Sequence, residues 1–140
     1  MWVRNPRMER FIFGFFLLLA FGDGILRFIV LTRTICNTGV AFGIELPQIV
    51  LWTALGLLLS LSLWYGRKAA DGESRLAWRL VFIGGVVNTV DRFVSGCVHD
   101  YLTLPLFPSF NLADMMLFLG VTYLLARMTG IFSTGKTYVG

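Results

Sequence analysis

The sequence predicts an all-α membrane protein that crosses the bilayer four times. Three observations lead to this fold class: 56% of the 140 residues are hydrophobic, only 14% are charged, and the basic residues bracket the apolar runs. About a quarter of the residues are charged in a typical soluble domain, and apolar runs flanked by Lys and Arg are typical of membrane proteins. The net charge of +4 is not gathered into an aromatic-laced patch, so no nucleic-acid partner is predicted.

Four apolar segments are interpreted as membrane spans within a single domain, residues 1–140. They lie at residues 11–31, 46–66, 76–94 and 112–130. The second is free of charge over 21 residues, which is long enough to span a membrane. The other three carry charges near their ends, where long side chains can reach the headgroups. A signal peptide is the alternative for the N-terminal segment, but no convincing small-x-small cleavage site follows it.

The distribution of Lys and Arg predicts that both termini lie in the cytoplasm. With four spans, nine of the twelve basic residues fall on the cytoplasmic side. In that topology one group of acids lies near the outer ends of the spans or between them: Asp23, Asp91, Asp100 and Asp114. Acids at a membrane are costly and usually functional, so this outer end is where we expect the site.

Most of these polar residues also have a structural interpretation. Asp23 and Arg27 are four residues apart and can pair on one helix face. Asn111 precedes an apolar run and is a good N-cap, which puts Asp114 at the N3 position, where a carboxylate favours the helix dipole. A local hydrogen-bonded clamp at the end of the third span is possible for three residues at helical spacing: Asn88, Asp91 and Arg92.

Asp100 has no comparable structural explanation, because it lies in the loop that joins spans three and four. Pro105 and Pro108 exclude a helix that would connect Asp100 to Asp114. Two acids brought together by separate elements cannot both ionise cheaply. One would then act as a base that activates water and the other as an acid that protonates a carbonyl oxygen. The pair therefore predicts the chemistry of aspartic proteolysis.

Other chemistries find less support in the sequence. His99 is the only histidine, so a Ser-His-Asp or Cys-His site would depend wholly on it. No H-E-x-x-H, CxxC or Walker-type loop occurs, so no metal or organic cofactor is expected, with His99 and Asp100 as metal ligands kept as an alternative. Cys36 and Cys97 are both placed on the outer side, where a disulfide is permitted. Unpaired, small apolar side chains are the favoured interpretation.

Four motifs occur in chain order along the sequence. They are NTGVAFG at 37–43, NTVDR at 88–92, V-x-D-aromatic at 98–101 and FNLAD at 110–114. With the acid and base at Asp23 and Arg27, they resemble the bacterial lipoprotein signal peptidases (signal peptidase II). The resemblance implies an aspartyl endopeptidase that cleaves the signal peptide of a prolipoprotein before its diacylglyceryl-modified cysteine. It also implies a multi-pass protein of the bacterial inner membrane, with a small extracytoplasmic β-platform and the active site at the outer face.

The resemblance assigns roles to particular residues. Asp100 and Asp114 match the catalytic dyad of the family. The residues that match substrate-positioning or supporting positions are Asn37, Gly39, Ala41, Phe42, Asn88, Asp91, Arg92, Val98, Asn111, Ala113, Asp23 and Arg27. Phe42 is expected in the outer platform, with simple packing as an equal alternative. The expected partners are the lipid-modified substrate and membrane lipid, no metal or cofactor is implied, and the small, self-contained site favours a monomer.

The chain departs from the family pattern at three places. Arg27 replaces the usual Lys, which changes the donor geometry. Val87 replaces the glycine that usually precedes the NxxDR motif, and the connection from Arg27 to Asn37 is shorter than usual. A shortened platform leaves open a non-hydrolytic relative that binds lipidated peptides. A small ion- or proton-coupled transporter is a further alternative, but it predicts acids along a path through the bilayer, whereas here they gather at one end.

Overall fold

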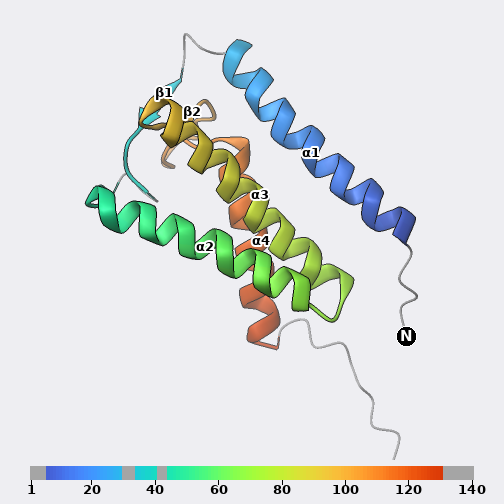
Figure 1. The fold of residues 1–140 in the computed structure, drawn as a ribbon. Coiled ribbons are helices and arrows are strands. Elements are labelled where there is room, and N and C mark those ends of the chain that lie inside the picture. The colour runs from blue at the N-terminus through green and yellow to red at the C-terminus, as the bar shows by residue number, and fades with distance from the viewer. Residues whose placement is uncertain (1–5, 30–33, 41–43, 131–140) are drawn as a thin grey trace, which may run out of the picture.

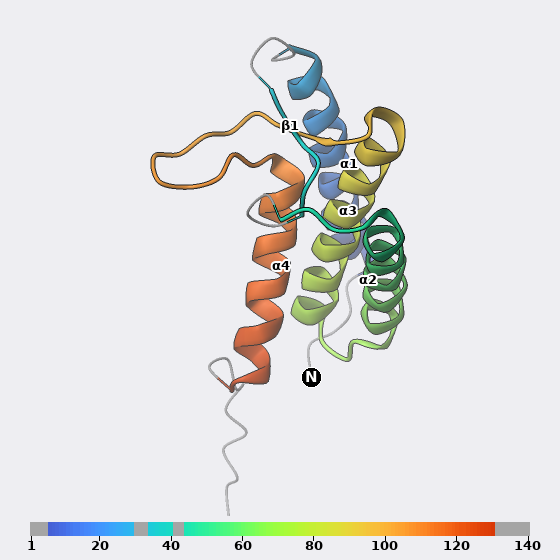
Figure 2. The same ribbon diagram turned by 90° about the vertical axis from the view of Figure 1, so that its left-hand side faces the viewer.

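The computed structural model describes residues 6–29, 34–40 and 44–130, and in it four helices form a bundle with a small sheet at one end (Figure 1). The elements in chain order are α1 (Pro6–Ile29), β1 (Ile35–Asn37), α2 (Gln48–Lys68), α3 (Gly72–Ser95), β2 (Val98–Asp100) and α4 (Leu112–Met128). The helices alternate in direction, so α1 begins and α4 ends at the end of the bundle opposite the sheet (Figure 2). The prediction of a mostly helical fold with a small β-element is confirmed.

The helix boundaries follow local signals that differ from the edges of the apolar segments. Helix α1 begins at Pro6, a residue favoured in the first helical turn. Helix α3 begins at Gly72, before the predicted residue 76, because Asp71 caps it and accepts the backbone N–H of Ser74 at 2.8 Å. It ends at Ser95, and Gly96 follows with φ +80°, the left-handed conformation that commonly closes a helix.

Asp71 also connects the α2–α3 turn to the end of α4. The guanidinium of Arg127 donates to its Oδ2 at 3.0 Å. Partial burial raises the pKa of Asp71, but the hydrogen bonds from Ser74 and the positive charge of Arg127 outweigh that effect and hold the pKa below its ordinary value of 3.8. The ionised carboxylate therefore stabilises the fold.

Replacing Asp71 by alanine should lower the free energy of unfolding by about 1 kcal/mol near neutral pH, since the N-cap is lost. The stabilisation from a carboxylate with a lowered pKa is fully present above the unfolded-state pKa and is lost as pH falls through the folded-state value. The difference in melting temperature between wild type and Asp71→Ala in detergent should therefore shrink at acidic pH. A difference that stays constant across that range would contradict this account, as would an Asp71→Asn variant with the same pH dependence as the wild type.

Helices α3 and α4 approach each other closely at two glycines. A Cβ atom on Gly84 would lie 2.6 Å from the carbonyl oxygen of Ala113, and one on Gly120 would lie 2.7 Å from that of Ala77. Small residues permit this kind of contact between helix backbones. Helix α1 covers the same region, where Leu19 and Ala20 are among the residues packed against a buried cluster: Ile83, Ala113 and Met116. The core thus lies between α3, α4 and α1.

The outer faces of all four helices carry large, exposed apolar side chains. Examples from α1, α2, α3 and α4 are Leu18, Trp64, Phe93 and Phe118, of which Phe93 is 80% exposed. Among the helices that the structure describes, Gln48–Lys68 is the one that meets the length and hydropathy expected of a membrane span. The four-span arrangement and the cytoplasmic termini therefore stay predictions.

The sheet consists of β1 and β2 in antiparallel pairing. The paired residues are Ile35 with Asp100, Cys36 with His99 and Asn37 with Val98. Asp100 lies in the connection between α3 and α4, as predicted, but it is the last residue of a strand and not part of an irregular loop. The following segment, residues 101–111, projects from the bundle (Figure 2) and is closed by one bridge between Leu102 and Phe110. It contains no helix, as its prolines predict.

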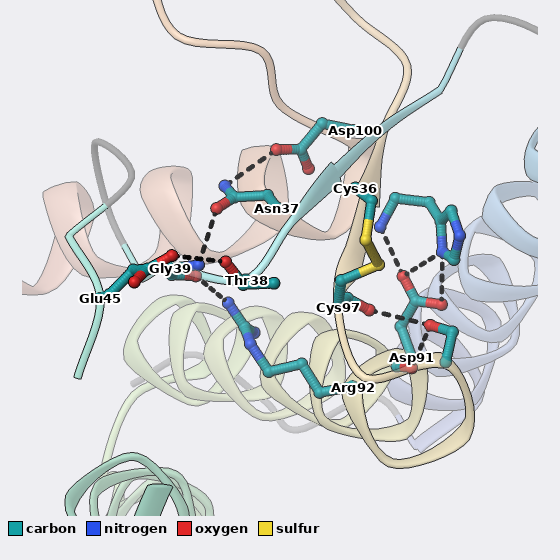
Figure 3. The surroundings of a disulfide bond; sticks show 11 residues. Cys36, Asn37, Thr38, Gly39, Glu45, Asp91, Arg92, Cys97 and Asp100 are labelled. Atoms are coloured by element: carbon teal, nitrogen blue, oxygen red, sulfur yellow. Dashed lines mark hydrogen bonds and ion pairs between the residues drawn. A yellow bond between two sulfur atoms is a disulfide. The ribbon is translucent and has the colours of Figure 1, made fainter. Parts of the chain in front are cut away.

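Cys36 and Cys97 form a disulfide at the edge of this sheet (Figure 3). Their Cα atoms lie 5.5 Å apart although the residues are separated by 61 positions. The interpretation of both as unpaired is therefore wrong. It failed because the pairing of β1 with β2 is a long-range contact that the spacing of cysteines in a sequence does not reveal.

Candidate active site

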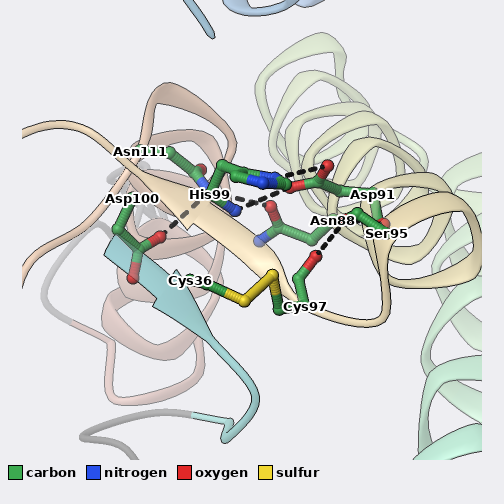
Figure 4. A network of polar contacts seen from close by, with 8 residues as sticks. All are labelled: Cys36, Asn88, Asp91, Ser95, Cys97, His99, Asp100 and Asn111. Carbon is green, nitrogen blue, oxygen red and sulfur yellow. Dashed lines mark hydrogen bonds and ion pairs between the residues drawn. A yellow bond between two sulfur atoms is a disulfide. The ribbon is translucent and has the colours of Figure 1, made fainter. Parts of the chain in front are cut away.

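Acid and amide side chains from β2, α3 and α4 meet at the sheet end of the bundle (Figure 4). The Nδ2 of Asn111 donates to Asp100 Oδ1 at 3.3 Å and to Asn88 Oδ1 at 3.1 Å. The Nδ2 of Asn88 in turn donates to Asp114 Oδ1 at 2.7 Å. Asp100 and Asp114 thus belong to one chain of hydrogen bonds that runs through two asparagine amides.

Asp114 is fixed by the start of its own helix. Asn111 Oδ1 accepts the backbone N–H of Asp114 at 2.9 Å, and Asp114 Oδ2 accepts the backbone N–H of Asn111 at 3.1 Å. This reciprocal pair is a capping box, so the predicted roles of Asn111 as N-cap and Asp114 at N3 are confirmed. The cap engages Oδ2 of Asp114 and leaves Oδ1 toward Asn88. Asp114 therefore stabilises the start of its own helix and also belongs to the hydrogen-bonded chain of the site.

Strand β1 supplies the second amide that holds Asp100. The Nδ2 of Asn37 donates to Asp100 Oδ2 at 3.0 Å (Figure 3). With the bond from Asn111 to Oδ1, each carboxylate oxygen of Asp100 accepts an amide hydrogen bond. Asn37 Oδ1 accepts the backbone N–H of Gly39 at 3.0 Å. The guanidinium of Arg92 donates to the carbonyl oxygen of Gly39 at 2.6 Å. Helix α3 therefore anchors the segment that carries Asn37.

The central members of this cluster are shielded from solvent. Asp100 is 1% exposed, Asn88 4% and Asn111 0%. Buried polar groups are costly unless they are hydrogen-bonded, and here the amides provide those bonds. The result is a buried Asp100 and a half-buried Asp114, both held by neutral amide donors.

The end of α3 connects three other elements through three polar side chains within its last two turns: Asn88, Asp91 and Arg92. Asn88 reaches α4 and Arg92 reaches the β1 segment, as described above. Asp91 reaches β2: its Oδ2 accepts the backbone N–H of His99 at 2.7 Å, and its Oδ1 lies 3.1 Å from His99 Nδ1. Asp91 therefore holds the strand that ends in Asp100. In the described part of the chain, no group of three or more His, Cys, Asp or Glu side chains is arranged to hold a metal ion.

Asp23 is completely buried at the same end of the bundle. Its Oδ1 accepts the hydroxyl of Tyr101 at 2.6 Å, and the same hydroxyl oxygen accepts the backbone N–H of Leu112 at 3.1 Å. One tyrosine thus joins α1 to the first turn of α4. The predicted partner of Asp23, Arg27, has a side chain outside the described residues.

Tyr101→Phe should therefore destabilise the protein more than it slows a reaction. The hydroxyl serves two buried groups, and removing one partner from a buried acceptor costs about 1–3 kcal/mol. Thermal unfolding in detergent should show a lowered melting temperature, with kcat reduced by less than about tenfold because the acids themselves are untouched. If the variant melts like the wild type, the Tyr101 hydroxyl does not support Asp23 in the way the structure indicates.

The remaining predicted site residues fall into two groups. Val98 and Ala113 are buried, 2% and 0% exposed. Ala41 and Phe42 lie outside the described residues, so the platform role of Phe42 stays a prediction. Nothing in the sequence predicts a contribution of Tyr101 or the cysteine pair to the site, and it suggests His99 only as an alternative metal ligand. The one local signal is that the aromatic residue after Asp100 is a tyrosine, which brings a hydroxyl group to this position.

These contacts define the class of protein. It is a helical bundle that carries, at one end, two aspartates linked by the amides of two asparagines. Its backbone is similar to that of a bacterial membrane enzyme solved by the in meso method at 2.3 Å resolution, with a TM-score of 0.77 at 21% identity. The match covers 92% of this chain and 94% of that chain. The model of the family "Signal peptidase (SPase) II" matches residues 8–130, and the chain belongs to that family.

Curated relatives agree with this assignment. A lipoprotein signal peptidase of Gloeothece citriformis (strain PCC 7424) is 36% identical over 97 residues, which are 65% of this chain and 60% of that protein. One of Nostoc punctiforme (strain ATCC 29133 / PCC 73102) is 34% identical over 107 residues, 73% of this chain and 65% of that protein. The chain thus spans less than two thirds of the length of either relative.

Proposed function

We propose that the chain is an aspartyl endopeptidase that cleaves the signal peptide of a prolipoprotein before its diacylglyceryl-modified cysteine. The observation that carries the proposal is the hydrogen-bonded chain from Asp100 through Asn111 and Asn88 to Asp114. Two acids presented by different elements are what acid–base hydrolysis of a peptide needs. Membership of the family and the names of the relatives supply the substrate class.

In the proposed reaction Asp100 and Asp114 hold a water molecule between them. One carboxylate takes a proton from the water as the water oxygen attacks the scissile carbonyl carbon. The other carboxyl group protonates the carbonyl oxygen. The tetrahedral intermediate then collapses, and a proton passes to the leaving nitrogen as the C–N bond breaks. The asparagines orient the acids without adding charge, which is a form of preorganisation.

The surrounding residues support this chemistry in different ways. Arg92 already donates to Gly39, and its buried Nε has no hydrogen-bond partner among the described residues. Arg92 therefore supports the site by holding the segment that carries Asn37. Arg27, Ala41 and Phe42 keep their proposed supporting roles through the resemblance of their motifs alone.

The proposed setting is the bacterial inner membrane, with the sheet end of the bundle at the outer face and the chain acting as a monomer. The exposed apolar side chains on all four helices support contact with lipid. At the opposite end, Lys68 Nζ lies 4.0 Å from the ring centroid of Trp64. Aromatic and cationic side chains gather in this way at membrane interfaces, and basic residues favour the cytoplasmic side.

The test is cleavage of a synthetic prolipoprotein peptide by the purified chain in detergent or proteoliposomes. Mass spectrometry should find one cut, directly before the diacylglyceryl-modified cysteine, and no cut in a matched peptide with an unmodified cysteine. Binding of the lipidated peptide without hydrolysis would replace the proposal with the non-hydrolytic relative. Voltage- or pH-driven cation flux in the proteoliposomes, without cleavage, would replace it with the transporter.

A further inference from the structure

The Cys36–Cys97 disulfide takes no part in the proposed chemistry, yet it lies directly beside it. Cys36 precedes Asn37, the residue that donates to Asp100 Oδ2. Cys97 follows Gly96, the residue that closes α3, and it begins the segment that leads through β2 to Asp100. Figure 3 shows the sulfur–sulfur bond beside the hydrogen bond between Asn37 and Asp100. The bond therefore joins the two strands that hold one acid and one of its donors.

The two strands are buried to very different extents. In β2, Val98 and Asp100 are buried, and Cys97 just before the strand is 2% exposed. In β1, Ile35 and Cys36 are exposed, and only Asn37 is half-buried. Strand β1 thus gains little stability from apolar burial. The disulfide links its exposed Cys36 to the buried Cys97.

A sheet of this size does not specify its own register strongly. Each strand has three residues, and an isolated two-stranded ribbon is marginally stable. Successive side chains alternate between faces, so a slip of one residue would turn Asn37 away from the face it occupies. The amide of Asn37 would then leave Asp100. The bond between Arg92 and the carbonyl oxygen of Gly39 constrains the segment beyond Asn37, whereas the disulfide constrains the strand before it.

We propose that the Cys36–Cys97 disulfide is a positioning element of the active site. It fixes the register of β1 on β2 and thereby keeps the Asn37 amide on the carboxylate of Asp100. The two cysteines act through Asn37 and do not touch the substrate. The catalytic consequence rests on the proposed peptidase function, whereas the effect on Asn37 does not. An enzyme that contains both thiols in reduced form has the same fold and a misplaced Asn37.

The bond itself is tested by mass spectrometry. The chain has two cysteines, so untreated protein should resist alkylation entirely. After treatment with a dithiol reductant, which gives two electrons and two protons to the bond and becomes a cyclic disulfide, it should take up two labels. Labelling of the untreated, folded protein would overturn the proposal at once.

The position of Asn37 is tested by NMR, without any need for activity. The chain has four asparagines (Asn5, Asn37, Asn88 and Asn111), so selective ¹⁵N-asparagine labelling gives a sparse set of side-chain amide signals. The Asn37→Ala variant identifies the Asn37 signal. That signal should shift or broaden in the double variant Cys36→Ser/Cys97→Ser, while the signals of Asn88 and Asn111 keep most of their dispersion. An unchanged Asn37 signal would overturn the proposal.

The effect on the reaction is tested by a double-mutant cycle. Cys36→Ser/Cys97→Ser and Asn37→Ala should each lower kcat by about 10- to 100-fold, with smaller changes in KM. Combined, they should lower it little further, because both remove the same contact. Val81→Ala, which opens a buried position in α3 away from the sheet, is the matched control: its effect should simply multiply with that of Asn37→Ala. Multiplying effects of the cysteine variant and Asn37→Ala would show that the disulfide acts only on stability.

A reductant supplies the last control, since it should slow the wild type and leave Cys36→Ser/Cys97→Ser unaffected. If the wild type cleaves no prolipoprotein peptide, the proposed function fails, and the NMR experiment still decides whether the disulfide positions Asn37. If the wild type cleaves and the cysteine variant is as fast, the function stands and the disulfide proposal falls.

Discussion

Asp100→Asn and Asp114→Asn should each lower kcat for prolipoprotein cleavage at least about 10³-fold, with a much smaller change in KM. An asparagine has nearly the volume of aspartate, but it can neither take a proton from water nor give one to a carbonyl oxygen. The loss is therefore expected in the chemical step and not in substrate binding. Single-turnover cleavage of the lipidated peptide, followed by mass spectrometry, measures it directly.

Asp91→Asn is the matched control for these two variants, because it makes the same change in the same region. Asp91 accepts the backbone N–H of His99 and so holds β2, but it is not a member of the hydrogen-bonded chain between Asp100 and Asp114. Its variant should have a lower melting temperature and a kcat that falls far less than 10³-fold. Normal cleavage by either Asp100→Asn or Asp114→Asn would remove the dyad from the mechanism. A folded but inactive Asp91→Asn protein would instead place Asp91 next to the reacting atoms.

Local signals in the sequence were sufficient to predict the start of α4. Capping depends on residues three positions apart, so Asn111 and Asp114 could be assigned to N-cap and N3 without knowledge of the fold. The prolines between Asp100 and Asp114 likewise excluded a helix there. The motif resemblance added that these capping residues also belong to a site, which spacing alone does not indicate.

Contacts between distant segments could not be predicted in the same way. The bond from Arg92 to Gly39 joins residues 53 positions apart, and the one from Tyr101 to Asp23 joins residues 78 apart. The disulfide depends on the pairing of two three-residue strands, which are too short to produce a recognisable alternation of polar and apolar residues. These contacts arise from the packing of the helices, and periodicity within a segment carries no information about which other segment it will meet.

Gly84→Ala is expected to lower the stability of the bundle substantially. Its new Cβ would lie 2.6 Å from the carbonyl oxygen of Ala113 and 3.0 Å from Cγ of Leu117. The first of these atoms belongs to the backbone of α4, so relief requires that the two helices move apart. Overpacking of this kind costs about 1–3 kcal/mol. The melting temperature in detergent should fall accordingly.

The same displacement should reach the active site, which makes Gly84→Ala a test of how packing and chemistry are connected. Asn88 lies one helical turn beyond Gly84, and Asp114 follows Ala113, so separating the helices at Gly84 pulls the Asn88 amide away from the carboxylate that it binds at 2.7 Å. We expect kcat to fall by about tenfold or more, since small errors in position are costly in catalysis.

Gly56→Ala is the matched control, because nothing lies within 4 Å of its new Cβ. Alanine also favours a helix over glycine by about 1 kcal/mol, so this variant should be as stable as the wild type or slightly more so, with full activity. Equal melting temperatures and rates for the two alanine variants would mean that the close contact of α3 with α4 does not hold Asn88 on Asp114.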